Sequence, residues 1–102
     1  MLAIKWIQER IKKNEYYFSK HADQERQNDN LTIAEIEEAI LSGRIIENYT
    51  DTGRGESCLI AGFTMIGKPV HIVCGLRVNW PVIITVYIPL PPKFKTPYER
   101  GR

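Results

Sequence analysis

Two histidines, His21 and His71, are the side chains in this sequence best suited to proton transfer near neutral pH. His71 lies in a run where Val70, Ile72 and Cys74 occupy alternate positions, which predicts a strand with one apolar face. His71 is then expected on the opposite face of that strand, away from the core.

The next predicted strand, residues 82–88, is expected to add a hydroxyl and a phenol to the same face of the sheet. Its even-numbered positions are all apolar, which leaves Thr85 and Tyr87 on the other side. Both apolar sets can share one side only if the connecting loop has an odd length, such as residues 78–80, or if a bulge lies near Gly75.

In such a hairpin His71 lies opposite Tyr87, with Thr85 and Arg77 on the same surface. This set suits cleavage of RNA without a metal. That reaction needs a base for the 2′-hydroxyl, an acid for the 5′-oxygen and cationic donors for the phosphate. The alternative is a hairpin whose polar side simply faces water, since Tyr and Thr are ordinary strand residues.

His21 lies at the start of a short predicted helix, where Glu25 at position i+4 is expected to orient its ring. Arg26 projects beside this pair. The alternative is a helix-start histidine that packs against the sheet. The catalytic assignment stays open, because either histidine could be the base and the acid could be Tyr87 or the other histidine.

Neither a metal nor another cofactor is expected. His71 and Cys74 are three positions apart on a strand and point to opposite faces, so they cannot chelate one ion together. Cys58 and Cys74 are predicted to be free thiols that fill the core, as is usual in a reducing cytoplasm. A cysteine–histidine nucleophile pair would require Cys58 to approach His71 from a neighbouring strand.

The composition is that of one globular domain spanning residues 1–102. Hydrophobic residues make up 43% and charged residues 25%, and 14 Lys+Arg against 12 Asp+Glu give a net charge of +2. These values argue against disorder and against a strong general affinity for RNA.

The longest uncharged stretch, residues 78–92, is too short and too rich in proline to span a bilayer. Lys5 and Glu9 interrupt the region where a secretory signal needs an apolar run, so a cytoplasmic protein without membrane association is expected.

Periodicity predicts helices in the first part of the chain and strands in the second. Thr32 and Glu35 form a capping box for the third helix, and Gly43 ends it. Helices followed by a strand meander are typical of an α+β fold, with N-terminal helices packed on one face of a four-stranded, mainly antiparallel sheet. Residues 89–102 are expected to form an extended, Pro-rich, basic tail over the sheet. The expected helices are 2–13, 21–27 and Thr32 to Gly43; the expected strands are 44–49, 57–65, 69–78 and 82–88, with turns at 51–55 and 66–68.

Positive charge is concentrated at the two ends of the chain. Residues 5–13 and residues 93–102 each sum to +3, whereas residues 20–56 sum to −5. If the two ends meet on one surface, they form a basic patch suited to RNA. The alternative is that these lysines and arginines are merely solvated.

Several short motifs occur in a fixed order along the chain. They are His21-Ala22 with Arg26, the capped helix from Thr32 to Gly43, Glu47-x-Tyr49-x-Asp51, Gly55-x-Ser57-x-Leu59, Gly67-x-Pro69-x-His71-x-Val73-Cys74, Ile84-Thr85-Val86-Tyr87-x-Pro89 and a terminal Arg100. In this combination the chain resembles the domain-of-unknown-function 4258 family over about residues 15–100. That family is similar to the RelE- and MqsR-like toxins, compact α+β ribonucleases whose sheet binds mRNA.

The resemblance implies a metal-independent endoribonuclease of the mRNA interferase type from a toxin–antitoxin system, acting on RNA that is free or on the ribosome. It also implies a small zinc-finger antitoxin as partner. Glu47 would orient a histidine or act as base. The candidate catalytic residues are His21, Glu47, His71 and Tyr87; the candidate RNA- and phosphate-binding residues are Arg26, Arg77, Thr85 and Arg100.

Two other functions fit the same residues. One is a non-catalytic module of this fold that binds a protein or nucleic acid, with its polar sheet face covered by the Pro-rich tail or by a second subunit. The other is a structural homodimer joined through an exposed strand edge.

Overall fold

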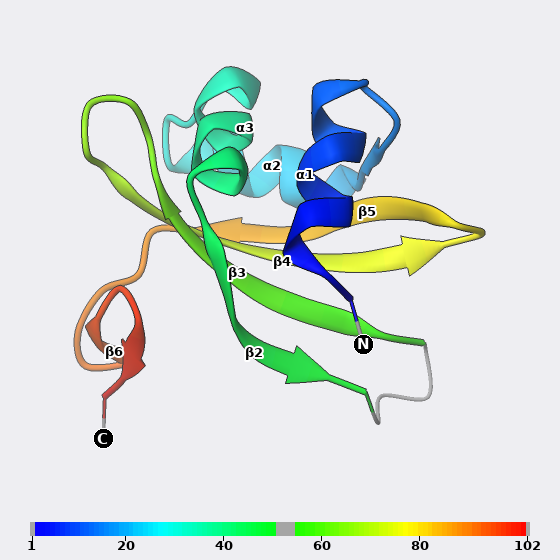
Figure 1. The fold of residues 1–102 in the computed structure, drawn as a ribbon. Helices are drawn as coiled ribbons and strands as arrows, with labels where there is room; N and C mark the ends of the chain where they lie inside the picture. Colours follow the sequence, from blue (N-terminus) through cyan, green and yellow to red (C-terminus); the bar gives the residue numbers. More distant parts are fainter. Residues whose placement is uncertain (1, 51–54, 102) are drawn as a thin grey trace.

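The computed structural model describes residues 2–50 and 55–101, in which helices lie over one face of a sheet and a C-terminal hairpin lies over the other (Figure 1). The turn predicted at 51–55 therefore falls, except for Gly55, outside the described residues. The helices are α1 (Ile4–Lys12), α2 (Lys20–Asn28) and α3 (Ile33–Leu41); the strands are β1 (Tyr17–Phe18), β2 (Arg44–Tyr49), β3 (Ser57–Phe63), β4 (Pro69–Arg77), β5 (Trp80–Tyr87), β6 (Phe94–Thr96) and β7 (Glu99–Arg100).

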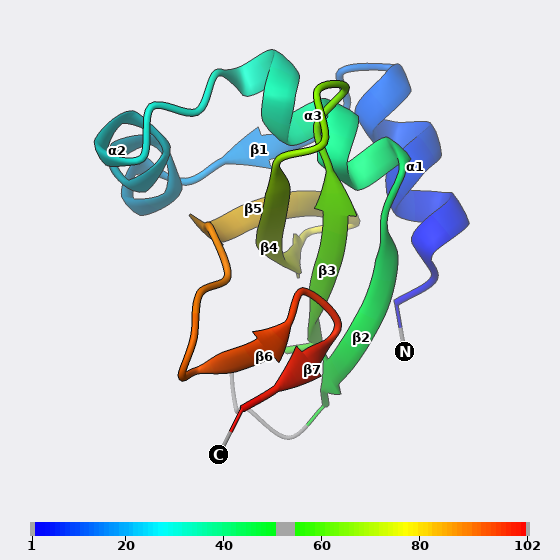
Figure 2. The same cartoon turned by 90° about the vertical axis from the view of Figure 1, so that its left-hand side faces the viewer.

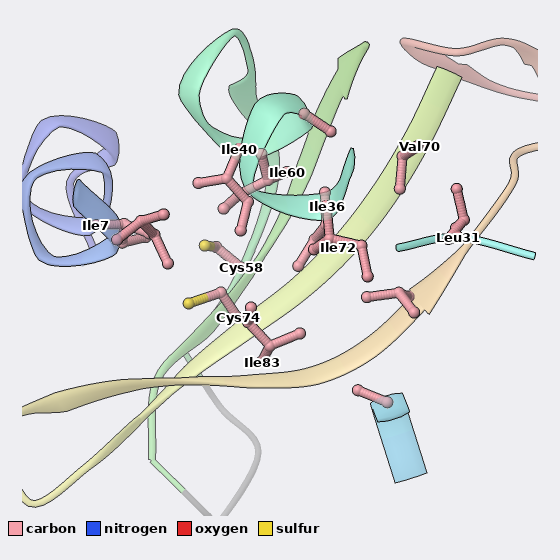
Figure 3. Packing of buried hydrophobic residues seen from close by; sticks show 14 of the residues in the cluster. Ile7, Leu31, Ile36, Ile40, Cys58, Ile60, Val70, Ile72, Cys74 and Ile83 are labelled. Atoms are coloured by element: carbon pink, nitrogen blue, oxygen red, sulfur yellow. The ribbon is translucent and has the colours of Figure 1, made fainter. Parts of the chain in front are cut away.

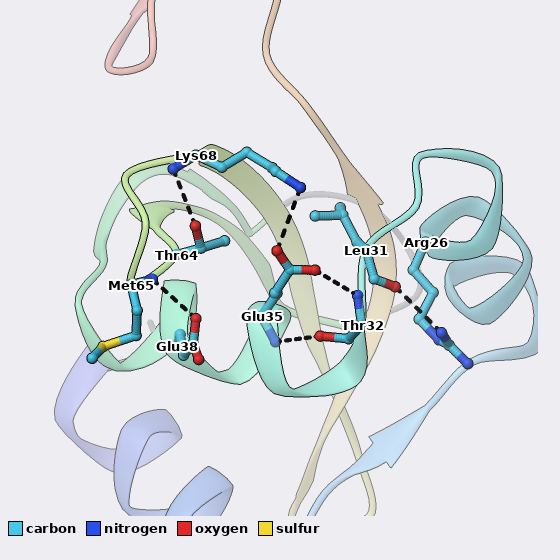
Figure 4. Close-up of polar contacts among 8 residues, drawn as sticks. All are labelled: Arg26, Leu31, Thr32, Glu35, Glu38, Thr64, Met65 and Lys68. Carbon is cyan, nitrogen blue, oxygen red and sulfur yellow. Dashed lines mark hydrogen bonds and ion pairs between the residues drawn. The ribbon is translucent and has the colours of Figure 1, made fainter.

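Local capping explains where the helices begin. The Thr32 hydroxyl accepts from the Glu35 N–H at 3.0 Å and the Glu35 carboxylate accepts from the Thr32 N–H at 2.9 Å, so the predicted capping box is confirmed (Figure 4). Ser19 caps α2 in the same way, because its Oγ accepts from the Ala22 N–H at 3.0 Å. α1, which has no side-chain cap, and α3 each turn an apolar stripe toward the sheet, whereas α2 buries only Ala22.

One core lies between the helices and the sheet (Figure 3). Ile7 from α1 and Ile36 from α3 are fully buried there against Ile72 from β4. Cys58 and Cys74 are buried free thiols in this core, as predicted. Burial raises the pKa of Cys58 to about 11, so its thiol stays protonated near neutral pH. Since both thiols point toward the helices, the alternative of a cysteine–histidine nucleophile pair is wrong.

The main sheet has five strands in the order β1-β5-β4-β3-β2. β1 is parallel to β5 and the other neighbours are antiparallel. The α+β class is confirmed, but the predicted count of four strands is wrong because β1 adds a fifth. A two-residue strand has no periodicity to read, and it is held at the edge by its backbone, as when the Ser19 N–H donates to the Ile83 carbonyl at 2.9 Å.

The β4–β5 hairpin closes by the second of the two predicted alternatives. Val78 and Asn79 form a two-residue turn with φ angles of 50° and 66°, the positive values of a type I′ turn. The compensating bulge lies in β5 at Ile84, opposite Val73 and Cys74, so the alternative of a bulge near Gly75 is confirmed and the odd loop is wrong. Ile83 is therefore buried in the core while Ile84 is 37% exposed, so the predicted parity of β5 is wrong before the bulge and right after it.

The Pro-rich tail lies over the sheet as expected, but as a hairpin rather than an extended segment. β6 and β7 pair antiparallel, and the Gly101 N–H donates to the Lys93 carbonyl at 2.9 Å where the hairpin closes. This hairpin crosses the sheet face opposite the helices (Figure 2). We call residues 93–101 the C-terminal hairpin.

The two basic ends of the chain do not converge. α1 packs into the core through Ile7 and Ile11, whereas the C-terminal hairpin lies over the other face through Phe94. The basic patch that required both ends on one surface is therefore not formed. Within residues 2–50 and 55–101, no helix has the length and apolar character needed to cross a membrane.

Candidate active site

His71 and Tyr87 face each other on the sheet surface that lies opposite the helices. They are directly paired in the β4–β5 register, as the strand parity predicted. His71 Nδ1 lies 3.1 Å from the Tyr87 hydroxyl, and the ring centroids are 5.2 Å apart. The hairpin therefore joins an imidazole to a phenol by a direct hydrogen bond.

The C-terminal hairpin buries His71 completely. The ring edge packs on Phe94 with centroids 4.4 Å apart, and Nε2 lies 2.5 Å from the Pro97 carbonyl oxygen. A carbonyl only accepts, so Nε2 carries the proton and donates to Pro97, and Nδ1 of the neutral ring accepts from Tyr87. Sequence reasoning missed Phe94 and Pro97, because the tail has no periodicity that would aim them at His71.

The electrostatics keep both groups in their neutral forms. Burial lowers the pKa of His71, against the opposing effects of the Pro97 carbonyl and the Glu47 carboxylate. Burial also raises the pKa of Tyr87. Near neutral pH the pair is thus an unprotonated imidazole acceptor beside an intact phenol donor, the states required of a general base and a general acid.

A second polar cluster joins β2 to the C-terminal hairpin. Arg100 donates to both carboxylate oxygens of Glu47, from Nε at 2.6 Å and from Nη2 at 2.9 Å. The Tyr49 hydroxyl donates to Glu47 as well. The bond from Arg100 is the main reason that the pKa of Glu47 is lowered, and burial together with Glu47 raises the pKa of Tyr49 to about 12. Glu47 is thus a firmly ionised carboxylate, which makes it a weak base and a strong anchor for Arg100.

The two clusters lie under the same hairpin. Arg100 stacks over the Phe94 ring at 4.9 Å, and Phe94 in turn contacts His71. Thr85 lies on this face two residues from Tyr87, and Lys93 lies over the Tyr87 ring at 5.4 Å. Of the predicted site residues, the structure therefore gathers His71, Tyr87, Glu47, Arg100 and Thr85 on one sheet face.

His21 and Arg26 lie apart from this cluster, on α2 beside β5. His21 Nε2 is 3.3 Å from a Glu25 oxygen, as the i+4 spacing predicted, and its side chain is 70% exposed. The alternative that His21 packs against the sheet is therefore wrong. Arg26 binds Asp23 at 2.7 Å and the Leu31 carbonyl at 3.3 Å (Figure 4), so its guanidinium ties α2 to the turn before α3.

Arg77 shares the face of His71 but not its site. Six residues of β4 separate the two positions, roughly 20 Å at the usual rise of a strand, and Arg77 lies over the Tyr17 ring at 5.9 Å. Arg77 is thus on the predicted surface but well apart from the His71–Tyr87 pair, because parity along a strand predicts the face and not the distance. Among the residues that the structure describes, no three His, Cys, Asp or Glu side chains gather as metal ligands.

The cover over His71 predicts that acid releases the C-terminal hairpin. The pKa of His71 in the docked state lies below its ordinary value of 6.5. When the pH falls below about 6.5, the undocked chain therefore binds more protons than the docked chain. The free energy of docking then weakens until the pH has fallen past the lowered pKa. Glu47 adds a second loss below about 4.5, since the undocked carboxyl then takes up a proton that the carboxylate paired with Arg100 does not.

Amide hydrogen exchange of residues 93–101, measured from pH 7 to about pH 3, is expected to show these two steps after correction for intrinsic exchange. The control is His71→Gln, whose amide does not titrate, and in which the first step should vanish while the second remains. An unchanged first step in this variant would contradict the role of His71.

A comparison with protein-family models finds the family described as "Domain of unknown function (DUF4258)", which matches residues 18–88. The match includes His71 and Tyr87 and ends before Arg100, so it is narrower than the resemblance over residues 15–100. The C-terminal hairpin and α1 both lie outside it. No curated protein and no solved structure matches the chain. Since the family model covers more than half of the sequence, this chain belongs to the DUF4258 family.

Proposed function

We propose that this protein is a metal-independent endoribonuclease of the toxin type, with His71 as general base and Tyr87 as general acid. The direct contact of 3.1 Å between the neutral imidazole and the phenol carries the proposal. Cleavage requires one group that accepts the proton of the 2′-hydroxyl and one that donates a proton to the 5′-oxygen. A neutral imidazole and an intact phenol side by side on one face meet both requirements.

The reaction is an internal displacement at phosphorus. His71 Nδ1 takes the proton of the 2′-hydroxyl, and the 2′-oxygen forms a bond to the adjacent phosphorus. The bond from phosphorus to the 5′-oxygen breaks, and the Tyr87 hydroxyl gives its proton to that oxygen. The products are a 2′,3′-cyclic phosphate and a 5′-hydroxyl, and proton exchange with water restores the pair.

Arg100 is suited to hold the phosphate. In the structure its two parallel donors are occupied by the Glu47 carboxylate, which resembles a phosphate in charge and in the spacing of its oxygens. A substrate phosphate would replace Glu47 on these donors. Thr85 supplies a further hydroxyl on the same face.

The substrate can reach His71 only when the C-terminal hairpin moves. The hairpin is short and rests on a few side-chain contacts, among them Phe94 on His71, Arg100 on Glu47, and Tyr98 under the Arg44 guanidinium at 3.9 Å. Small units of this kind open with a lower free energy than the core. The closed form is thus the resting state of the proposed enzyme.

The test is cleavage of single-stranded RNA by the purified protein in EDTA, with detection of the cyclic phosphate end. His71→Ala and Tyr87→Phe are each expected to lower the rate by about 100-fold or more, the usual contribution of a general acid or base. Tyr87→Phe keeps the ring in place and removes only the hydroxyl. Ile66→Ala, at an exposed loop position, is the control for contaminating nucleases and should cleave as the wild type does.

The second candidate function is a non-catalytic module of the same family. The observation that favours it is that the C-terminal hairpin covers His71 through Phe94 and the Pro97 carbonyl. This alternative predicted that the Pro-rich tail covers the polar face of the sheet. The absence of cleavage by the wild type, or equal cleavage by the wild type and His71→Ala, would leave the binding module as the function. In that case His71→Ala changes only the stability of the C-terminal hairpin.

A further inference from the structure

Aromatic rings and arginines alternate along one edge of the molecule, at the end of β4 farthest from His71. Arg77 lies over the Tyr17 ring at 5.9 Å, and the Tyr17 and Trp80 rings are 5.2 Å apart with a tilt of 34°. Arg10 of α1 lies 5.2 Å from Trp80 and 5.3 Å from Trp6. We call these five residues the aromatic–arginine edge.

The strand part of this edge faces the same side of the sheet as His71. Arg77 has the parity of His71 along β4, and Trp80 is its partner in β5. Tyr17 of β1 is paired with Val82 of β5, and Val82 is paired with Gly75 of β4. Since Gly75 has the parity of His71, Tyr17 lies on the same face of the sheet as His71. Tyr17, Arg77 and Trp80 therefore continue the proposed catalytic surface, whereas Trp6 and Arg10 reach them from α1 on the other side of the sheet.

The edge is open to solvent where it could receive a ligand. Tyr17 is 46% exposed and Arg77 is exposed, so a ring face and a guanidinium are both available. Arg10 is the more enclosed member and binds Glu15 at 3.4 Å, which makes it a support for the two tryptophans. Lys13, the exposed C-cap residue of α1, adds a positive charge near the end of this helix.

A hollow lies on this face between Arg77 and His71, because its lining includes Val73 and Gly75, the β4 positions of the same parity between them. It has a volume of about 200 Å³, and Ile84 of β5 also lines it. Gly75 leaves room for the Ile84 side chain, since a Cβ at Gly75 would lie 2.7 Å from Ile84 Cδ1. An apolar surface with Arg77 at one end and Arg100 near the other suits bases above it and phosphates at the ends.

We propose that the aromatic–arginine edge and this hollow form a binding site for single-stranded RNA, with a base stacked on Tyr17 and a phosphate on Arg77. Stacking on exposed rings together with guanidinium contacts to the backbone is the usual mode of single-strand binding. The site deepens the proposed function by naming where the substrate strand is held, roughly 20 Å from His71 along β4. Its binding, however, requires no chemistry at His71.

The probe is a fluorescein-labelled 2′-O-methyl oligouridine of twelve nucleotides, which cannot be cleaved through a 2′-hydroxyl. Its fluorescence anisotropy is measured with the full chain at 50 mM and 200 mM salt. The double variant Tyr17→Ala/Arg77→Ala is expected to bind at least about 10-fold more weakly than the wild type, since loss of one stacked base alone accounts for that factor. The salt dependence should also become shallower, because one phosphate contact is lost.

Two controls separate this site from other causes. Tyr17→Phe/Arg77→Lys keeps a ring and a charge, and it should bind within about twofold of the wild type if stacking and charge carry the affinity. Lys68→Ala removes a cation at the opposite end of β4 and should also bind within this range. Circular dichroism checks that each variant is folded.

Equal binding by the wild type and the double variant overturns the inference, as does the absence of probe binding at 50 mM salt. Either result can be obtained while the wild type still cleaves RNA and His71→Ala does not, in which case only the binding site fails. Binding that depends on Tyr17 and Arg77, without any cleavage by the wild type, supports the site and removes the proposed catalysis.

Discussion

Replacing Gly101 with alanine is expected to open the C-terminal hairpin and to raise the rate of RNA cleavage by about tenfold or more. A Cβ at this position would lie 1.9 Å from the Pro92 carbonyl oxygen and 3.0 Å from its carbon. Both atoms belong to the backbone, so the closed end of the hairpin has to separate. A loss of about 1.4 kcal/mol of docking free energy increases the open fraction tenfold.

Two measurements report the opening independently. The first is cleavage of single-stranded RNA in EDTA, and the second is the pKa of His71 by NMR, which should rise toward 6.5 when burial is relieved. Gly67→Ala is the matched control, because it is the same substitution in an exposed turn with nothing within 4 Å of the added Cβ. It should leave both the cleavage rate and the pKa of His71 unchanged.

The two measurements can disagree, and the disagreement is informative. A raised pKa of His71 without any cleavage would show that the hairpin is a cover and would contradict the endoribonuclease. An unchanged pKa and an unchanged rate would show that the hairpin tolerates the substitution, and the resting-state argument would then be wrong.

Replacing Gly62 with alanine is expected to lower the free energy of unfolding by about 3 kcal/mol or more, a large part of the stability of a domain of this size. Gly62 of β3 lies against α3 so closely that a Cβ would be 1.8 Å from the Ala39 carbonyl oxygen and 2.7 Å from its carbon. Neither backbone can yield without separating α3 from the sheet, and Ile36 and Ile40 would lose their packing with it.

Urea unfolding followed by circular dichroism measures this effect. Gly67→Ala again serves as the control: its positive φ of 87° disfavours any side chain, but the cost is expected to be only about 1 kcal/mol because no neighbour is displaced. Similar losses in the two variants would contradict the close approach of β3 to α3.

Much of the fold follows from local patterns. Three features depend only on patterns within about ten residues: the capping box at Thr32, the helix that follows it and the alternation along β4. The structure contains all three. The facing of His71 and Tyr87 was predicted as well, with a bulge near Gly75 as one of two alternatives, although the odd-length loop was wrong. The error cancels because the two-residue turn and the bulge at Ile84 together shift the register by the amount that an odd loop would have supplied.

Only the residues of the candidate site that lie on β4 and β5 could be grouped from the sequence pattern. His71, Tyr87 and Thr85 could be placed on one face by parity alone. Arg77 could not be excluded in this way, because parity carries no information about the distance along a strand. The ion pair between Glu47 and Arg100 joins residues 53 positions apart in the chain, and no local pattern specifies such a contact.

The sequence by itself thus determined the helices, the order of the long strands and the pairing of an imidazole with a phenol, since each depends on periodicity or on neighbouring hydrogen bonds. Only the tertiary structure decided that His71 is enclosed by Phe94 and the Pro97 carbonyl, and that the two basic ends lie on opposite faces. Those features depend on how a short hairpin without periodicity docks on a sheet, and docking is decided by shape and charge complementarity between segments far apart in the chain.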